Sequence, residues 1–168
     1  MGVSPAMAPE EPTYVTLDFV QGKPVAIDGE EMKASDIIRK LNKLGGENGI
    51  GLLDIVENRM TGMKDRGVYE TPGGTILYRA HEVLEQITVD KDTMHMKRKL
   101  AVDYADLIYN GKWWTPLREA LTAFAVETQK YVTGQVKLKL YKGNIITSSV
   151  TSPVSLYSEN IVTFEESD

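Results

Sequence analysis

Apolar and polar residues alternate at both ends of the chain, and this period of two is typical of half-buried strands. Residues 14–20 alternate in this way, and after a Gln-Gly-Lys turn residues 24–28 are predicted to pair back as a hairpin. Residues 134–143 show the same alternation, and residues 144–150 are predicted to pair with them across Gly143–Asn144. The pattern therefore predicts two pairs of antiparallel strands.

Four segments between these strands repeat apolar residues at spacings of three and four, which is the period of an amphipathic helix. Residues that can cap a helix, glycines that can end one and prolines that suit a first helical turn set the expected limits. These limits are Ser35 and Gly45–Gly46 for the first helix, Thr71–Pro72 for the start of the second, Asp92 and Asn110–Gly111 for the third, and Thr115–Pro116 for the start of the fourth.

The stretch between the first two helices is apolar at first and then strongly charged. The segment 50–58 is short, partly β-branched and mostly apolar, which predicts a buried strand. Residues 59–67 contain glycine and charges without any period, which predicts a loop. Together the elements predict an α+β fold with a mixed, largely antiparallel sheet flanked by helices.

The composition is that of one globular domain, with 168 residues, 42% of them hydrophobic and 26% charged. A net charge of −5 argues against a sequence-independent nucleic-acid binder, which needs clustered Lys and Arg. The chain has no cysteine, which excludes disulfides and thiolate metal sites and suits a cytoplasmic protein. No apolar run approaches the ~18 residues of a membrane span, and no secretion signal opens the chain.

A change of composition near each end predicts the domain limits. Three prolines fall within residues 1–12, which we expect to form a linker. Residues 13–164 are expected to form the domain, and the acidic residues 165–168 to fray.

Residues 71–75, Thr-Pro-Gly-Gly-Thr, raise the question of a phosphate-binding loop, because helix N-termini bind anions. Neither G-x-x-x-x-G-K-[ST] nor G-x-G-x-x-G is present, so a tight entry into a helix is the favoured interpretation. His81 and His95 lack the spacing of metal ligands, and no nucleophile elbow is present. We therefore predict no metal site and ordinary roles for both histidines.

Charged side chains surround the predicted loop. Asp54 and Glu57 stand an odd number of residues apart on a strand, so they should point to opposite faces and not act as an acid–base pair. Glu57 ends the apolar strand, where sites are often built, and a binding role and a solvated or capping role stay equally open. For Arg59 and Arg66, solvation is favoured over binding of an anionic substrate.

Several long motifs occur in one order along the chain. They are DIVENRMTGMKDRGVYETPGGTIL at 54–77, YNGKWWTPLREAL at 109–121, TGQVKLKLYKGN at 133–144 and SPVSLYSENIVTF at 152–164. By these motifs the chain resembles argininosuccinate synthase. The resemblance implies an ATP-dependent carbon–nitrogen ligase of arginine biosynthesis and the urea cycle. In that reaction the ureido oxygen of citrulline attacks the α-phosphorus of ATP, Mg²⁺ accompanies the nucleotide, and the aspartate amine then displaces AMP to give argininosuccinate.

The resemblance also implies two citrulline contacts. The family uses a glutamate of an I-V-E-N-R motif and a tyrosine of a G-[VI]-Y-E-T-P motif, which fall here on Glu57 and Tyr69. A carboxylate suits the α-ammonium of citrulline, and a phenol can donate or accept a hydrogen bond at a polar end. Two positions depart from the usual pattern, because Leu52 stands where arginine is usual and Asp65 where serine is usual.

Two parts of the family's pattern do not occur in these 168 residues. One is the S-G-G-x-D-[ST] loop of the ATP-binding domain, and the other is the C-terminal arm that helps to hold a homotetramer. We therefore expect residues 13–164 to be a partial substrate-binding domain that holds neither ATP nor Mg²⁺ and is inactive alone. A stand-alone association or regulatory protein on the same scaffold stays open, as does the oligomeric state of the chain.

Overall fold

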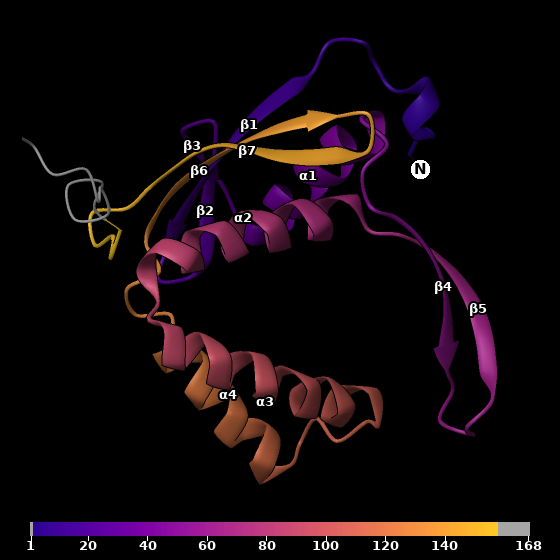
Figure 1. Ribbon diagram of the computed structural model, residues 1–168, viewed down its shortest axis with the longest axis vertical. Coiled ribbons are helices and arrows are strands. Elements are labelled where there is room, and N and C mark those ends of the chain that lie inside the picture. The colour runs from indigo at the N-terminus through magenta and orange to yellow at the C-terminus, as the bar shows by residue number, and fades with distance from the viewer. Residues whose placement is uncertain (1, 158–168) are drawn as a thin grey trace, which may run out of the picture.

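The computed structural model describes residues 2–157 (Figure 1). It combines three parts: a body, made of the main sheet and the helices at 34–47 and 72–88; a projecting ribbon, residues 52–70; and a helical hairpin, residues 91–127. The strands are β1 (Thr13–Val20), β2 (Lys23–Ile27), β3 (Glu30–Glu31), β4 (Leu52–Asn58), β5 (Lys64–Glu70), β6 (Gly134–Tyr141) and β7 (Asn144–Thr151). The α-helices are α1 (Ala34–Glu47), α2 (Pro72–Thr88), α3 (Lys91–Tyr109) and α4 (Pro116–Glu127). The predicted α+β class is confirmed.

A five-stranded sheet of order β3-β2-β1-β6-β7 joins the two ends of the chain. The predicted hairpins β1–β2 and β6–β7 are both present, and β1 also pairs with β6, with Val15 opposite Leu138. Every pairing in the sheet is antiparallel. The alternation seen in the sequence thus aligns the apolar positions of β1 and β6 on one face.

Helices α1 and α2 cover that face and enclose the core (Figure 1). The predicted stripe on α2 is confirmed, because Ile76, Ala80 and Leu84 are fully buried. Gly45 of α1 lets the two helices approach closely, since a Cβ there would stand 2.8 Å from the Cβ of Pro72. The buried cluster comprises Val15, Leu17, Phe19, Ile27, Ile37, Leu41, Ile50, Ile76, Ala80, Val83, Leu84, Val132, Val136, Leu138 and Leu140.

The predicted limits of α1 were wrong at both ends. The N-cap position is Lys33, with no side-chain cap, and Ser35 lies inside the first turn. Gly45 and Gly46 do not end the helix, because their backbone stays helical while they pack against neighbouring segments. The glycine that ends it is Gly49, which has φ +70° and whose N–H donates to the Gly46 carbonyl.

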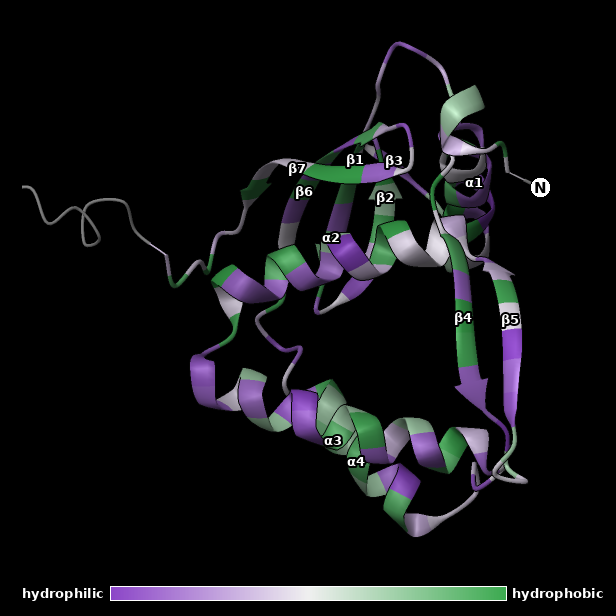
Figure 2. Ribbon diagram, turned by 45° about the vertical axis from the view of Figure 1, so that its right-hand side comes forward, coloured by the Kyte–Doolittle hydropathy of each residue, from purple (hydrophilic) through white to green (hydrophobic). Residues whose placement is uncertain are grey.

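The predictions for residues 50–67 were also wrong in part. β4 is a strand, but it is largely exposed: among the described residues it pairs with β5, and α3 reaches only its end (Figure 2). Residues 64–67 are not loop but belong to β5, which pairs antiparallel with β4 as a separate two-stranded ribbon. The turn is confined to 59–63, and the charged residues Lys64, Asp65 and Arg66 hide the strand pattern of β5 from an apolar-period search.

Helices α3 and α4 form a hairpin that stands away from the body (Figure 1). Asp90, two residues before the predicted start, caps α3 by accepting from Thr93 N. Thr115 caps α4 as predicted. The only buried residue that the two helices contribute within the described chain is Met94, and it keeps 9% of its surface exposed. The predicted apolar stripes are therefore half-buried at best: Leu100, Tyr104, Leu121 and Phe124 are partly covered, and Met96 and Leu117 are exposed.

The start of the chain lies against the end of α1. The segment before β1 contains one 3-10 turn, Pro5–Met7, and Val3 N donates to the Gly46 carbonyl at 2.9 Å. The prediction for residues 165–168 lies outside the described residues, and the linker assignment of 1–12 stays a prediction. None of the helices in residues 2–157 is both long and apolar enough to cross a membrane.

Candidate functional site

The ribbon β4–β5 carries the two residues singled out by the resemblance. Its register places Glu57 opposite Asp65, and Leu53 opposite Tyr69. Because cross-strand partners share a face and alternate residues share a face, Glu57, Asp65 and Tyr69 all lie on one side of the ribbon. Asp54 lies on the other side, in agreement with the predicted separation of Asp54 from Glu57.

Glu57 and Tyr69 are in direct contact. The Tyr69 hydroxyl donates a hydrogen bond to Glu57 Oε1 at 2.6 Å, which is the length expected for a charge-assisted bond. Glu57 Oε2 receives no hydrogen bond from the residues that the structure describes. The pair thus presents one occupied and one available carboxylate oxygen.

The carboxylate also changes the acidity of the phenol. The hydrogen bond to Glu57 raises the pKa of Tyr69 above its ordinary value near 10, and partial burial and the nearby negative charge act in the same direction. The neutral phenol is therefore the donor at physiological pH, and Glu57 is the acceptor.

A second pair lies on the same face, next to the turn. Arg59 Nε donates to Asp65 Oδ2 at 2.9 Å, and its Nη2 donates to the same oxygen. This contact lowers the pKa of Asp65, with the hydrogen bond as the main cause and the attraction between the charges as the second. Asp65 thus holds the guanidinium that stands closest in sequence to Glu57.

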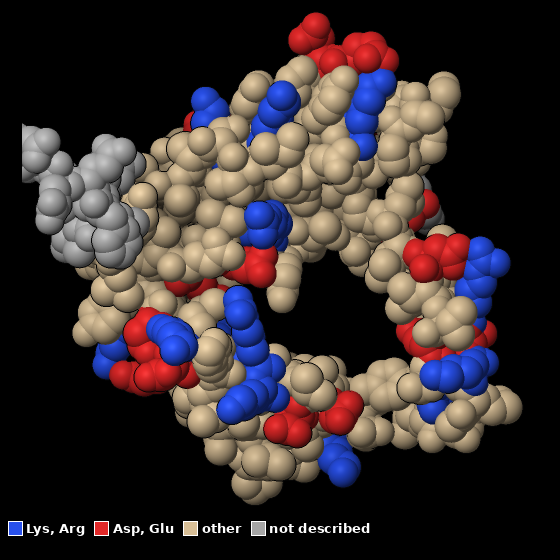
Figure 3. Space-filling view, in the orientation of Figure 1, with Lys and Arg blue, Asp and Glu red and all other residues tan. Residues whose placement is uncertain are grey.

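A matching pair occupies the opposite face. Arg66 Nε donates to Asp54 Oδ1 at 2.8 Å, and this bond lowers the pKa of Asp54. Acidic and basic groups therefore lie side by side along the ribbon (Figure 3). Arg59 and Arg66 are each paired with an aspartate, which the sequence analysis did not predict, and the preference for solvation over binding of an anionic substrate stays a prediction.

The far end of the ribbon reaches the helical hairpin. Tyr109, the last residue of α3, donates from its hydroxyl to the Asn58 carbonyl at 3.3 Å. The space-filling view shows an opening bounded by the body, the ribbon and α3 (Figure 3). Glu57 stands directly before the residue that makes this contact.

Residues 71–75 form a helix entry, as favoured from the sequence. Thr71 occupies the N-cap position and Pro72 the first helical position, although the Thr71 side chain makes no capping bond. Gly73 N donates to Asn42 Oδ1 at 2.9 Å, so one N–H of the helix start is already used by α1. The segment therefore anchors the end of β5 on the body.

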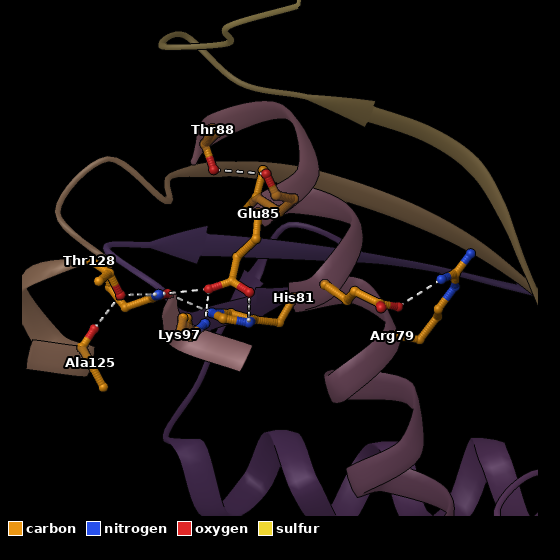
Figure 4. A network of polar contacts seen from close by, with 10 residues as sticks. Arg79, His81, Glu85, Thr88, Lys97, Ala125 and Thr128 are labelled. Carbon is orange, nitrogen blue, oxygen red and sulfur yellow. Dashed lines mark hydrogen bonds and ion pairs between the residues drawn. The ribbon is translucent and has the colours of Figure 1, made fainter. Parts of the chain in front are cut away.

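A buried polar cluster at the junction of α2 and the helical hairpin was not found from the sequence (Figure 4). Glu85, whose side chain is only 7% exposed, accepts from Lys97 of α3 and from Gln129 Nε2, which follows α4. His81 Nε2 lies 2.7 Å from Gln129 Oε1, so it donates there. No spacing signal exists, because these residues come from two helices and the turn after α4, which are far apart in the sequence.

The histidines have the ordinary roles that were predicted. His81 is partly buried in this cluster and His95 is exposed on α3. Among residues 2–157, no three side chains of the kinds that bind metals gather closely enough to hold an ion. The candidate site on the ribbon thus consists of a carboxylate, a phenol and the Arg59–Asp65 pair on one face, and the Arg66–Asp54 pair lies on the opposite face.

Comparison with known proteins identifies a family and several relatives of this chain. A family model described as "Arginosuccinate synthase C-terminal domain" matches residues 1–168. Argininosuccinate synthase of Lachnospira eligens is 57% identical over 168 residues, which is all of this chain and 41% of that protein. The enzyme of the same name from Clostridium botulinum is 59% identical over 159 residues, or 95% of this chain and 39% of that protein.

The chain belongs to the argininosuccinate synthase C-terminal domain family. It spans about two fifths of the length of the curated relatives that it matches.

Proposed function

We propose that this chain supplies part of the citrulline site of an argininosuccinate synthase, a ligase that joins citrulline and aspartate with ATP. The names of the relatives support the enzyme class. The observation that supports the site is the 2.6 Å bond between the Tyr69 hydroxyl and Glu57 Oε1, on an exposed polar face. In this proposal Glu57 Oε2 accepts from the α-ammonium of citrulline.

The chemistry of the pair fits an amino acid with a neutral ureido group. A carboxylate that is already fixed by a phenol loses little freedom when an ammonium binds, so the interaction is preorganised. Because Arg59 is paired with Asp65, it does not neutralise Glu57. The Glu57 carboxylate therefore keeps its negative charge available to attract a cation. The site would therefore hold the ammonium end and leave the ureido end to other parts of the enzyme.

ATP and Mg²⁺ belong, in this proposal, to the part of the relatives' length that this chain does not span. The described residues offer neither a metal-binding group nor the glycine-rich pyrophosphate loop. When bound, ATP would supply the adenylyl group that turns the ureido oxygen into a leaving group. The role of this chain is to bind and orient citrulline, and we expect the chain alone to form no argininosuccinate.

Titration of the ¹⁵N-labelled chain with citrulline tests the site. We expect chemical-shift changes on β4 and β5 with weak affinity, and a loss of about tenfold in affinity for Glu57→Gln, because the charge-assisted bond is removed. Asp54→Asn is the matched control, since it removes a carboxylate from the same strand on the opposite face, and its affinity should not change. Equal binding by the wild type and Glu57→Gln would contradict the assignment.

The exposed helical hairpin favours a second candidate, a protein used for association. Trp114 is 84% exposed and Val102 and Leu117 are more than half exposed, which is unusual for large apolar side chains on adjacent elements. Sedimentation of the chain measures this directly. A purely monomeric chain over a wide concentration range would contradict association through this surface.

A further inference from the structure

Gly67 lies on β5 between Asp65 and Tyr69, and its backbone conformation is one that any residue could adopt. Gly67 does not have a positive φ. It lies in the middle of β5, where it is the cross-strand partner of Ile55. Glycine weakens a strand interior, because it packs nothing and loses much conformational freedom on folding. A residue with a side chain would be expected here unless the space is needed.

The space above Gly67 is filled by the ring of Tyr69. A Cβ built on Gly67 would stand 2.5 Å from Tyr69 Cε2, 2.7 Å from Cζ and 2.6 Å from the hydroxyl oxygen. All three distances are shorter than real Cβ contacts, so a side chain at 67 and the observed ring cannot coexist. The missing Cβ thus makes room for one ring in one orientation.

The register shows why the ring must lie there. Tyr69 is opposite Leu53, four positions before Glu57, which corresponds to ~13 Å along the strand. The phenol can reach Glu57 only by lying along the ribbon, across the Ile55–Gly67 pair, while the glutamate extends toward it. Gly67 is the residue over which this path runs.

We propose that Gly67 is a positioning residue of the citrulline site, because its missing side chain lets Tyr69 lie along the ribbon and hold one oxygen of Glu57. This inference rests on the proposed function for the identity of the ligand, but its geometric part stands on the contacts alone. A side chain at 67 lifts the ring, frees the Glu57 carboxylate to rotate and removes the orientation of its second oxygen. Glu57 and Tyr69 touch substrate in this scheme, and Gly67 acts through them.

The geometric part is tested on this chain without substrate. With tyrosine labelled at ¹³Cζ, the Tyr69 signal is assigned by its loss in Tyr69→Phe and its titration midpoint is measured. The wild-type midpoint should lie above the ordinary value of about 10, and in Gly67→Ala it should return toward that value. Gly74→Ala is the control, because a Cβ there meets nothing within 4 Å. An unchanged midpoint in Gly67→Ala overturns the inference.

The functional part is tested with citrulline, in the enzyme that joins this chain to the remaining length of its relatives. Gly67→Ala should raise the KM for citrulline by about tenfold, equal to ~1.4 kcal/mol, while the KM for aspartate stays as in Gly74→Ala. An equal KM for citrulline in both variants overturns the inference. If the midpoint of Tyr69 shifts as expected but neither wild type nor variant uses citrulline, the proposed function fails and the geometry of Gly67 survives.

Discussion

The body and the two projections differ in how they use the same kinds of residue. All of the core cluster comes from the five-stranded sheet, α1, α2 and the short segments beside them. The ribbon and the α3–α4 hairpin contain comparable apolar residues, yet Val56 is 66% exposed and Val102 is 65% exposed. Apolar content alone therefore does not make a core, because a core also needs an opposing surface.

The difference also separates stability from function. The body is held by burial, which is non-directional and large, and the projections are held by polar contacts such as Lys97 to Glu85 and Tyr109 to Asn58. The candidate site lies on the ribbon, where side chains can meet a ligand. Substitutions should therefore act on stability in the body and on binding in the ribbon.

The largest effect should come from truncating a core leucine. Leu84→Ala removes a fully buried side chain between α2 and the sheet and should lower the free energy of unfolding by ~2–5 kcal/mol. Leu117→Ala is the matched control, because Leu117 of α4 is 56% exposed, and it should lower the free energy of unfolding by less than ~1 kcal/mol. Urea unfolding followed by circular dichroism measures both. Similar losses would show that the hairpin packs as tightly as the body.

Next comes the close approach of α1 and α2. Gly45→Ala places a Cβ 2.8 Å from Pro72 Cβ and 2.9 Å from Ile76 Cδ1, which should destabilise the protein by roughly 1–3 kcal/mol through overpacking. Gly46→Ala, one residue on, meets only ordinary contacts of 3.4 Å or more. It should be neutral or stabilise the helix by up to ~1 kcal/mol. Equal midpoints of thermal unfolding for the two variants would contradict the close packing.

The third largest effect should come from the buried polar cluster around Glu85. Lys97→Met keeps most of the side chain but leaves the 7% exposed Glu85 carboxylate without its cation, which should cost about 1–2 kcal/mol. Arg39→Met removes a cation from the exposed pair with Asp36 and should cost below ~1 kcal/mol. Hydrogen exchange should show the loss in α3 and α4 before α1 and α2. A uniform loss over all helices would show that the hairpin and body unfold as one unit.

The smallest effect should be the acid titration of the ribbon. Arg66 and Arg59 lower the pKa values of Asp54 and Asp65 below the ordinary 3.8, so both pairs are intact at neutral pH. Their contribution is present above about pH 4 and is lost as the pH falls through the lowered pKa values. Carboxyl ¹³C titration should give midpoints below the ordinary value, and Arg66→Gln should restore only that of Asp54. If Asp65 moved as well, the two faces would be coupled.

The sequence predicted the body better than the projections, for a physical reason. Alternation and helical period report one-sided burial, and the elements of the body each bury one face, as at Leu17 and Leu84. β5 was missed because Asp65 and Arg66 form ion pairs, and charged side chains leave no apolar period. The end of α1 was misplaced because Gly45 is explained by contact with Pro72, a partner that lies far along the chain.

The candidate site divides in the same way. The resemblance led to Glu57 and Tyr69, and the structure shows that they touch. No pattern in the sequence indicates that Tyr69 crosses Gly67 to do so, because this depends on the register of β4 against β5. The Glu85 cluster was missed for the same reason, since its members meet only after the helices are placed.

The contact between Tyr109 and Asn58 changes the mechanics of the ribbon. Without it, β4 and β5 would be a cantilever, fixed where β5 enters α2 and free at the turn. With it, the ribbon is a beam supported at both ends, and such a beam deflects less under the same load. Glu57 directly precedes Asn58, the residue that α3 contacts. A displacement of α3 should therefore move the Glu57 carboxylate more than it moves the parts of the ribbon that lie farther from this contact.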